Sequence, residues 1–372
     1  NNAPYDNPAW MVDNILLGGG ITVSNIAYQG DSAQIGWFNA VNTNLGIDSG
    51  IVLSSGNVLD LVGPNASGST STGFAGLGDP TLDSVLAPDL TQDAAVLEFD
   101  FIPTSDTLKF NYVFGSEEYL EFVTSFNDAF GFFLSGPNPA GGMYVDENLA
   151  IVPGTANTPV SIFNVNDVTN SAYYVDNGDG LTAPQNTDPT VIQFDGFTTP
   201  LTATAAVNCG DTYHIKLVVA DVNDDAYDSG VFLEAGSFFS PALTVIDDLG
   251  IDSTFMNIAC GQEVILTANG GPGGIYEWYD YNTGSLVHAG PSITISNNGT
   301  YYVVASDISG CSTISDTFSI VAPSFGLKDF TVSHTDVSCW DDTDGTIGIS
   351  IDDYINVLSY NFFLDGNINS NP

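Results

Sequence analysis

Short runs of alternating apolar and polar residues fill the sequence from Ile21 to about Pro241, and they constrain the fold more than any other feature. Turn residues separate the runs at the spacing of an all-β sandwich or jelly roll. Helix signals almost vanish here, apart from a turn or two near Thr81 to Leu86. We expect twelve strands, in the order ITVSNIAY, IGWF, GIVLSSG, AVLEFDFI, LKFNYVF, FGFFL, NLAIVPG, PVSIFNV, VIQFDGF, LTATAAV, YHIKLVVA and GVFLEAGSFF.

A short helix is predicted ahead of the first strand. Asn7 is a good N-cap, Pro8 suits the first helical position, and Gly18 to Gly20 end the helix. Trp10 and Leu16 belong to its apolar face.

The chain is 372 residues long, which favours more than one domain. No linker interrupts residues 1–241, so we expect them to form one large β-sandwich or jelly-roll-like head. Residues 242–323 have the size and strand order of an immunoglobulin-like sandwich, with Trp278 on the third strand. Residues 324–372 are too short for a sandwich and stop inside a strand pattern, which suggests a chain that continues.

Four cysteines lie far apart in the sequence, and no C-x-x-C pair indicates zinc. Cys260 and Cys311 both fall in the Ig-like segment, so we predict a disulfide between them. Cys209 and Cys339 are expected to be unpaired, or paired outside these residues.

The charge balance excludes several classes of partner. Forty-five acidic residues face three lysines and no arginine. Binding to nucleic acid needs Lys and Arg, and anionic lipid repels such a surface. The composition suits a saline or calcium-containing exterior, although acidity that only keeps a secreted protein soluble explains it equally well. No run is long and apolar enough to be a membrane span.

Two acidic segments adjoin predicted strands. Between Phe110 and Pro137, two aromatic-rich strands flank a turn that contains four carboxylates and no Lys or Arg. Such charges repel one another unless a cation lies among them. The candidate metal ligands of this turn are Glu117, Glu118 and Asp128.

The second segment follows the strand YHIKLVVA. Asp221, Asn223 and Asp225 have the spacing that opens a calcium loop, but the sixth and twelfth positions of an EF-hand are here Ala226 and Phe232. A loop between strands can still gather oxygen ligands around Ca²⁺, and the alternative is that these residues only form Asx-turns. The candidate ligands are Asp221, Asn223, Asp224, Asp225 and Asp228.

Signals for catalysis are weak. Glu117 and Glu118 are neighbours on an extended chain and point to opposite faces, so they do not form a glycosidase pair. The three histidines lie in different neighbourhoods, and neither G-x-S-x-G nor H-E-x-x-H occurs. We therefore expect no catalytic residues and no enzyme.

Residues 1 to about 240 resemble the choice-of-anchor L domain of large surface proteins of Bacteroidota. The resemblance rests on several blocks in order, among them NILLGGGITVSNIAYQG, DAAVLEFDFIP, YVFGSEEYLEFV, FNDAFGFFLSGPN and TYHIKLVVADVNDDAYDSGVFLEAGSF. From residue 325 the chain is similar to the start of a gliding-motility adhesin repeat, through Val337-Ser338-Cys339 and Asp344-Gly345-Thr346-Ile347. The resemblance implies type IX secretion and cell-surface attachment, and it implies no defined reaction.

Together these observations predict a secreted cell-surface adhesin or filament protein, of which this is an N-terminal segment, with a head stabilised by calcium. Expected partners are further copies of the chain, other surface proteins, glycans or target cells. Two alternatives stay open. In a lectin, exposed aromatics such as Tyr119 and Tyr227 would grip a sugar, and a glycoside hydrolase would use the carboxylates.

Overall fold

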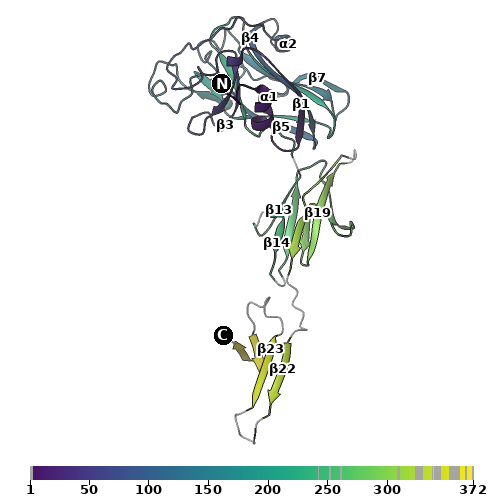
Figure 1. Ribbon diagram of the computed structural model, residues 1–372. Coiled ribbons are helices and arrows are strands. Elements are labelled where there is room, and N and C mark those ends of the chain that lie inside the picture. The colour runs from purple at the N-terminus through teal and green to yellow at the C-terminus, as the bar shows by residue number, and fades with distance from the viewer. Residues whose placement is uncertain are drawn as a thin grey trace. The chain divides into compact units, whose positions relative to one another are not determined.

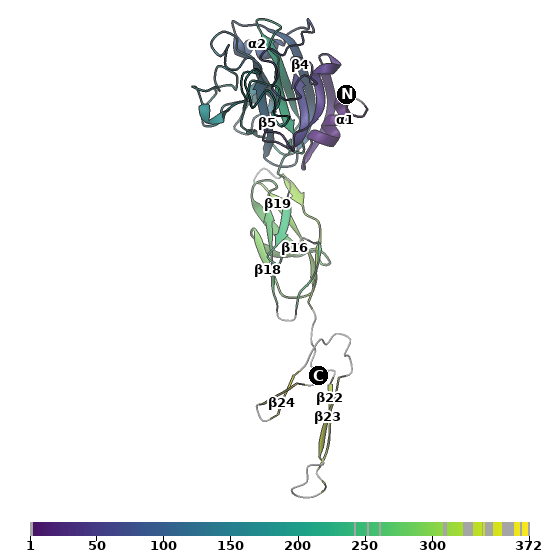
Figure 2. The same cartoon turned by 90° about the vertical axis from the view of Figure 1, so that its left-hand side faces the viewer.

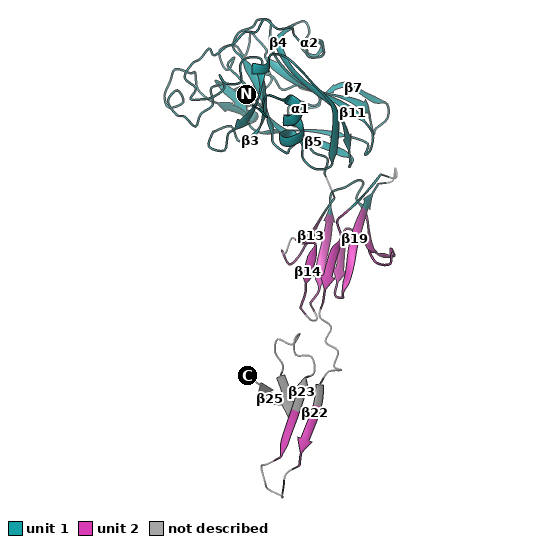
Figure 3. Ribbon diagram, viewed as in Figure 1, with its two compact units in different colours: residues 1–244, 269–275, 305–314 teal, residues 245–268, 276–304, 315–372 magenta. Residues whose placement is uncertain are grey.

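The computed structural model describes residues 3–241, 243–250, 253–259, 262–307, 311–322, 330–336, 338, 345–351, 361–364 and 367–370. Residues 1–244, 269–275 and 305–314 form one compact unit, and residues 245–268, 276–304 and 315–372 form a second (Figure 3). The predicted boundaries at 241 and 323 stay predictions. Figure 1 labels the main elements.

The head, residues 3–241, is built from two antiparallel sheets. The five-stranded sheet has the order β1-β4-β11-β6-β7, and the seven-stranded sheet has the order β2-β3-β12-β5-β9-β8 with β10 beside β5. The strands of the first sheet are β1 (Ile21–Gln29), β4 (Thr91–Pro103), β6 (Ala129–Pro137), β7 (Met143–Asn148) and β11 (Tyr213–Val222). Those of the second are β2 (Ile35–Asn39), β3 (Ser49–Ser54), β5 (Thr107–Ser116), β8 (Tyr174–Asp176), β9 (Gly196–Thr198), β10 (Leu201–Ala206) and β12 (Ser229–Glu234). The predicted all-β class is confirmed.

The aromatic alternation seen in the sequence supplies the core. Phe110, Tyr112 and Phe114 of β5 pack against Phe130 and Phe132 of β6, with ring centroids 4.8–5.2 Å apart. All five rings are buried in the main core cluster, which draws on both sheets. Burial of this much aromatic surface is the dominant stabilising term of such a sandwich.

Both outer faces of the sandwich are covered as well. Val113 and Phe232 face a second cluster that includes Phe194, and Val218 and Val222 face a third that includes Leu82 and Leu86 of a helix. Central strands buried on both faces explain why β11 and β12 read as nearly continuous apolar runs.

The two predicted helices are present. Helix α1 (Pro8–Met11) has the Asn7 side chain accepting from Trp10 N at 3.2 Å, and it runs on into a π-helical turn, η1 (Val12–Leu16). Figure 2 shows α1 beside the head's strands. Helix α2 (Pro80–Leu86) is capped by Asp79. Two 3₁₀ turns complete the helical content of the described head, η2 (Ser32–Gln34) and η3 (Ser171–Tyr173).

Three predicted strands of the head are wrong in whole or in large part. Asn148 is the last residue of β7, and residues 149–154 and 159–165 make only isolated bridges. Residues 191–197 are strand only from Gly196. Their apolar residues are nevertheless buried: Val152, Val160 and Ile162 belong to the main core. These segments therefore fill the core from irregular backbone, which hydrophobic patterning cannot distinguish from a strand.

The Ig-like segment also consists of strands. A three-stranded sheet has the order β13-β15-β18, and a second sheet has the order β14-β21-β19-β16-β17 with β20 beside β19. Trp278 lies on a strand as predicted, but on β16, the fourth strand of this segment rather than the third. It is buried, and its indole Nε1 donates to the Gly290 carbonyl at 3.1 Å. The strands are β13 (Thr244–Asp247), β14 (Phe255–Asn257), β15 (Val264–Asn269), β16 (Ile275–Asp280), β17 (Leu286–Ala289), β18 (Ser292–Ile295), β19 (Gly299–Ser306), β20 (Ser312–Ile314) and β21 (Phe318–Val321).

Two hairpins follow. Strand β22 (Phe330–Thr335) pairs with β23 (Thr346–Ile351), and β24 (Asn361–Leu364) pairs with β25 (Asn367–Ser370). Of the residues behind the adhesin-repeat resemblance, Val337, Cys339 and Asp344 lie outside the described residues.

The predicted Cys260–Cys311 disulfide is wrong. Cys311 is bonded to Cys209, with Cα atoms 6.0 Å apart, so Cys209 is not free either. The reason is that residues 305–314 pack with the head in one compact unit, although their sequence neighbours belong to the Ig-like strands. Cys260 and Cys339 lie outside the described residues.

Candidate functional site

One end of the sandwich brings the two acidic segments together. In the five-stranded sheet the last residue of β11, Val222, pairs with the first of β4, Thr91. In the seven-stranded sheet Ser229, which opens β12, pairs with Ser116, which closes β5. Because antiparallel strands start and stop at a common edge, residues 117–128 and 221–228 meet at this edge. We call it the acidic end.

Asp128 links the two sheets at the acidic end. Its Oδ1 accepts from the backbone N–H of Val222 at 3.0 Å, and its Oδ2 accepts from the Ser229 hydroxyl at 2.8 Å. Val222 belongs to one sheet and Ser229 to the other. The carboxylate is buried, and both of its oxygens are used.

Asp221 is the most isolated of the acidic residues. Leu217 and Val219 face the interior of the sandwich, and alternation along β11 places Asp221 on the same side. Its side chain is buried, and neither carboxylate oxygen has a hydrogen-bond partner. The Ser55 hydroxyl donates to the Ser229 carbonyl at 3.3 Å, and it also lies close enough to Asp221 to offset part of the rise in the pKa that burial causes. A buried carboxylate in this state is strongly unfavourable unless it is neutralised.

Glu117 and Glu118 lie in the turn that follows β5, and they point to different neighbours. Glu117 Oε1 accepts from Gln193 Nε2 at 3.1 Å, on the side of the outer cluster around Phe194. Glu118 lies near Asp128, whose charge raises its pKa. Both side chains are buried, and Oε2 of each is without a hydrogen-bond partner.

Asp228 flanks these groups. Both of its oxygens accept from the backbone N–H of Thr72, at 3.1 and 2.9 Å. Its carboxylate lies against Gly56, where a Cβ would lie 1.7 Å from Oδ2. Gly56 is therefore required for the loop to approach the carboxylate so closely.

Burial raises the pKa of all of these carboxyls. The pKa rises to about 9 for Glu117 and for Glu118, to about 8 for Asp128 and to about 7 for Asp228, in each case mainly by burial. The pKa of Asp221 is raised well above its usual value, by burial and then by the charge of Asp128. Each group therefore favours either a proton or an added positive charge.

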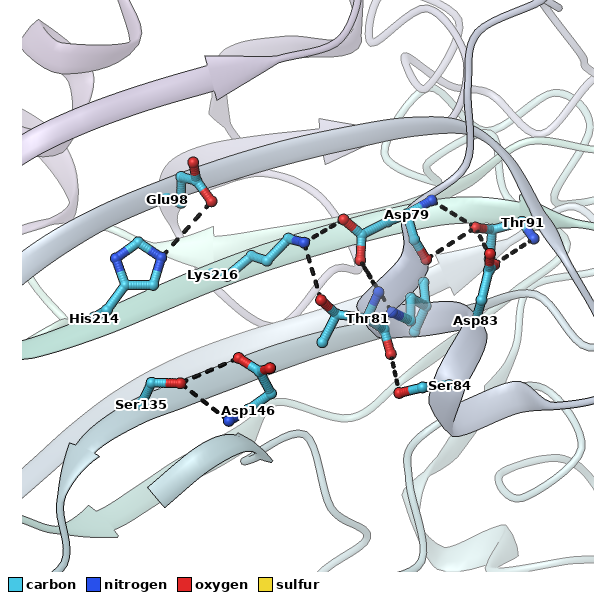
Figure 4. A network of polar contacts seen from close by, with 11 residues as sticks. Asp79, Thr81, Asp83, Ser84, Thr91, Glu98, Ser135, Asp146, His214 and Lys216 are labelled. Atoms are coloured by element: carbon cyan, nitrogen blue, oxygen red, sulfur yellow. Dashed lines mark hydrogen bonds and ion pairs between the residues drawn. The ribbon is translucent and has the colours of Figure 1, made fainter. Parts of the chain in front are cut away.

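Lys216 and His214 of the head pair with carboxylates away from the acidic end. Lys216 pairs with Asp79, the cap of α2, and donates to Thr81 Oγ1 at 3.2 Å (Figure 4). His214 lies 2.8 Å from Asp100 and 3.7 Å from Glu98. Among the ion pairs of the described residues, none includes a carboxylate of the acidic end.

The other predicted ligands lie nearer the surface. Asn223 and Asp225 are exposed, and the Asn223 amide donates to Asp89 Oδ1 at 3.0 Å. Asp224 is half-buried and accepts from Ala226 N at 3.3 Å, in the manner of an Asx-turn. The structure therefore separates the predicted ligand list into a buried group and a surface turn.

The lectin interpretation loses one of its two aromatic contacts. Tyr119 was expected at the surface, but it is completely buried, and its hydroxyl donates to the Val165 carbonyl at 2.7 Å. The backbone turns after β5 and directs this ring into the core cluster. Tyr227 is half-buried, with its ring centroid 4.9 Å from that of Phe122.

Sequence reasoning missed two buried carboxylates. Asp195 follows Phe194, and burial raises its pKa to about 7. Asp93 is buried at the start of β4 and accepts from Phe74 N at 2.8 Å and from Gly76 N. Asp195 lies in the sequence FDGF, directly after the buried Phe194.

The oxygen-only chemistry of the acidic end fits a hard cation such as Ca²⁺. Glu117, Glu118 and Asp221 each have at least one buried oxygen without a hydrogen-bond partner, which is available as a ligand. Within the described ranges, no three acidic, His or Cys side chains converge into a complete metal-binding set. Water or rotated side chains would have to supply the remaining ligands.

Comparison with known proteins assigns the head. The family model of the choice-of-anchor L domain matches residues 2–239. The chain belongs to the choice-of-anchor L domain family. An Ig-like domain described as CHU_C associated matches residues 251–323, so the predicted domain order is confirmed. A choice-of-anchor L domain followed by an Ig-like domain fits a cell-surface protein, and neither is an enzymatic family.

Similarity to solved structures is weak. The chain covers 90% of a DIP-gamma IG1+IG2 structure with 62% of its own length, at 11% identity and a TM-score of 0.18. It covers 91% of the adhesin domain of Epf from Streptococcus pyogenes with 70% of its length, at 10% identity and a TM-score of 0.18. It covers 38% of a beta-1,2-glucanase from Parabacteroides distasonis with 84% of its length, at 10% identity and a TM-score of 0.16. These values carry no functional argument. A comparison with curated proteins gave no match.

Within the ranges that the structure describes, no helix combines the length and apolar character needed to cross a membrane.

Proposed function

We propose that this protein is an extracellular adhesive or structural component of the cell surface, and that calcium stabilises its choice-of-anchor L head. The observation that carries the calcium part is Asp221, a buried carboxylate with both oxygens unpartnered. It lies close to Asp128, which in turn lies close to Glu118. We call these three residues the interior cluster. The family assignment supports the surface location.

Calcium would be held by the interior cluster, with Asp228 adding negative charge nearby. Bound there, the cation would supply the positive charge that the surrounding residues lack. The two sheets would be joined through it, because Asp128 already contacts Val222 in one sheet and Ser229 in the other. Protons are the competing source of charge, since the pKa of Asp128 and of Glu118 lies at about 8 and 9.

Thermal melting distinguishes calcium from protons as the source of the neutralising positive charge. At pH 8, removing calcium with a chelator should lower the melting temperature of the full chain, and restoring calcium should raise it again. At pH 5 the carboxyls retain their protons, so the calcium effect should shrink. The proposal would be contradicted if neither the chelator nor added calcium changed the melting temperature at pH 8.

The surface role requires a separate test. Antibodies against the head should label intact cells, and brief protease treatment of those cells should remove the label. Self-association is tested by size-exclusion chromatography at rising concentration, where a strict monomer would count against assembly into filaments. Glycan-array binding would instead favour the lectin alternative.

The type IX route of export, which the resemblance implies, belongs to the same proposal. Deleting a core component of that secretion system in the producing cell should leave the protein inside. Its normal appearance outside such cells would exclude this route without affecting the calcium claim.

A further inference from the structure

We propose that Glu117 and Asp195, the outer pair, form a second divalent-cation site that is separate from the interior cluster. This inference rests on the proposed function, because it assumes that the head binds divalent cations. It assigns a role to Asp195, which sequence reasoning did not identify. The ligand class is a hard cation such as Ca²⁺ or Mg²⁺.

The two sites lie on opposite sides of the seven-stranded sheet. Tyr112 and Phe114 face the interior core, and Val113 faces the outer cluster that contains Phe194. Glu117 and Glu118 lie in the turn after β5, so their sides are assigned from their contacts. Glu117 accepts from Gln193, the residue that precedes Phe194 of the outer cluster, whereas Glu118 lies near Asp128.

A chain of side-chain amides joins the two carboxylates of the outer pair. Gln193 Nε2 lies 3.1 Å from Glu117 Oε1 and 3.2 Å from Asn65 Oδ1. Asn65 Nδ2 in turn donates to Asp195 Oδ1 at 2.8 Å. One oxygen of each carboxylate is thus fixed by an amide, and the orientation of both groups is set.

The second oxygen of each carboxylate has no hydrogen bond of normal geometry. The pKa of Glu117 is raised mainly by burial and is lowered in part by the backbone of Thr70, which therefore lies close to this carboxylate. Glu117 Oε2 and Asp195 Oδ2 have no hydrogen-bond partner, although both side chains are 1% exposed. Two buried, oriented and unpartnered oxygens of like charge repel one another strongly unless a cation or a proton lies with them. Asp195 is also the strongest charged influence on Glu117, which indicates that the two groups are close.

Backbone oxygens lie around the outer pair. The Ser67 carbonyl accepts from Gln193 Nε2 at 2.6 Å, and a Cβ on Gly68 would lie 2.5 Å from the Asp179 carbonyl. Gly180, at a φ of +68°, allows the facing loop to approach Ser67 and Gly68. The candidate metal-ligand atoms, which are the carboxylate and carbonyl oxygens, favour Ca²⁺ or Mg²⁺ over the metals that prefer nitrogen or sulfur.

Calcium counting on variants of the full chain tests the second site. The experiment uses equilibrium dialysis against calcium at pH 8, with bound metal measured by atomic emission. The double variant Glu117→Gln with Asp195→Asn keeps acceptors for Gln193 and Asn65 but removes both charges. We expect it to bind one calcium ion fewer per chain than the wild type, while Asp128→Asn loses a different one.

The matched control is Glu147→Gln with Asp48→Asn, since both residues are exposed in the same domain. It should bind as much calcium as the wild type. Near-ultraviolet circular dichroism checks that every variant is folded, and a variant that fails this check is replaced by the single change Asp195→Asn.

Each outcome decides between the two sites. If the outer double variant retains the full calcium count, the second site is wrong and the interior site stands. If only the outer variant loses calcium, the interior site is wrong and the outer pair stands. If the wild type binds none, both sites are wrong.

Discussion

Replacing Asp128 by Asn gives opposite effects on stability with and without calcium. The change is nearly isosteric. The remaining oxygen can accept from Val222 N, and the new amide can donate to the Ser229 hydroxyl oxygen, so both contacts of the carboxylate have a replacement. What is removed is the negative charge.

The size of the stability change follows from the pKa of Asp128, which burial raises from 3.8 to about 8. Each tenfold shift in a protonation equilibrium corresponds to about 1.4 kcal/mol. At pH 8 and without a cation, this single group therefore lowers the free energy of unfolding by about 5 kcal/mol relative to a group that does not titrate. Asn avoids this loss, so about 5 kcal/mol is the upper limit of its gain.

In chelator at pH 8, Asp128→Asn should therefore melt higher than the wild type. For a domain of this size, about 1 kcal/mol shifts the melting temperature by roughly 2–4 °C. We expect a rise of about 5–15 °C. In calcium at 100 times its dissociation constant, the wild type should gain about 2.7 kcal/mol, and the variant should gain much less because a ligand is missing.

Differential scanning calorimetry on both proteins, in calcium and in chelator, measures all four values. Asp48→Asn serves as the control, since Asp48 is exposed and its change should leave all four values nearly constant. If Asp128→Asn is destabilised equally in calcium and in chelator, the carboxylate acts only through its hydrogen bonds, and the electrostatic reasoning is refuted.

Three further predictions follow from the same structure. In chelator, stability should be greatest below about pH 4 and fall as the pH rises towards about 9. Burial raises the pKa of the two glutamates of the acidic end from 4.5 to about 9, so over this range they keep their protons in the folded chain but lose them on unfolding, which favours the unfolded state. A pH series of melting curves checks this prediction, and a rise in stability over that range would contradict it. Tyr119→Phe should cost about 1–3 kcal/mol in urea unfolding, since the Val165 carbonyl loses its buried donor, and an unchanged midpoint would disprove that role. Peptic digestion without reductant, followed by mass spectrometry, should yield a peptide pair that links Cys209 to Cys311, and a Cys260–Cys311 pair would overturn the assignment. Cys209→Ser should lower the free energy of unfolding by about 2–5 kcal/mol.

Local pattern was enough to predict the strands and helices with strong signals. Alternation in Phe110, Tyr112 and Phe114 predicted a strand with one buried face, and Asn7-Pro8 predicted a capped helix start. The same reasoning failed for residues 148–165, because Val152 and Ile162 are buried by tertiary packing without a ladder of hydrogen bonds.

The acidic end could be predicted only in part. The sequence argument that successive side chains alternate predicted that Glu117 and Glu118 point to opposite faces. In the structure their neighbours differ, since Glu117 contacts Gln193 and Glu118 lies near Asp128. That Asp128 and Asp221 meet depends on the pairing of β11 with β6 and β4, which no local spacing reveals. The disulfide failed for a related reason, since Cys209 and Cys311 are 102 residues apart and are brought together only by the fold.

A crystal structure grown in calcium tests the central claim most directly. Anomalous scattering from calcium should produce a peak within bonding distance of Asp128 and Asp221. At least one oxygen of Asp221 should then coordinate the ion. Well-ordered carboxyls in calcium-saturated crystals, with no anomalous peak at the interior cluster, would show that protons neutralise them and would contradict the account.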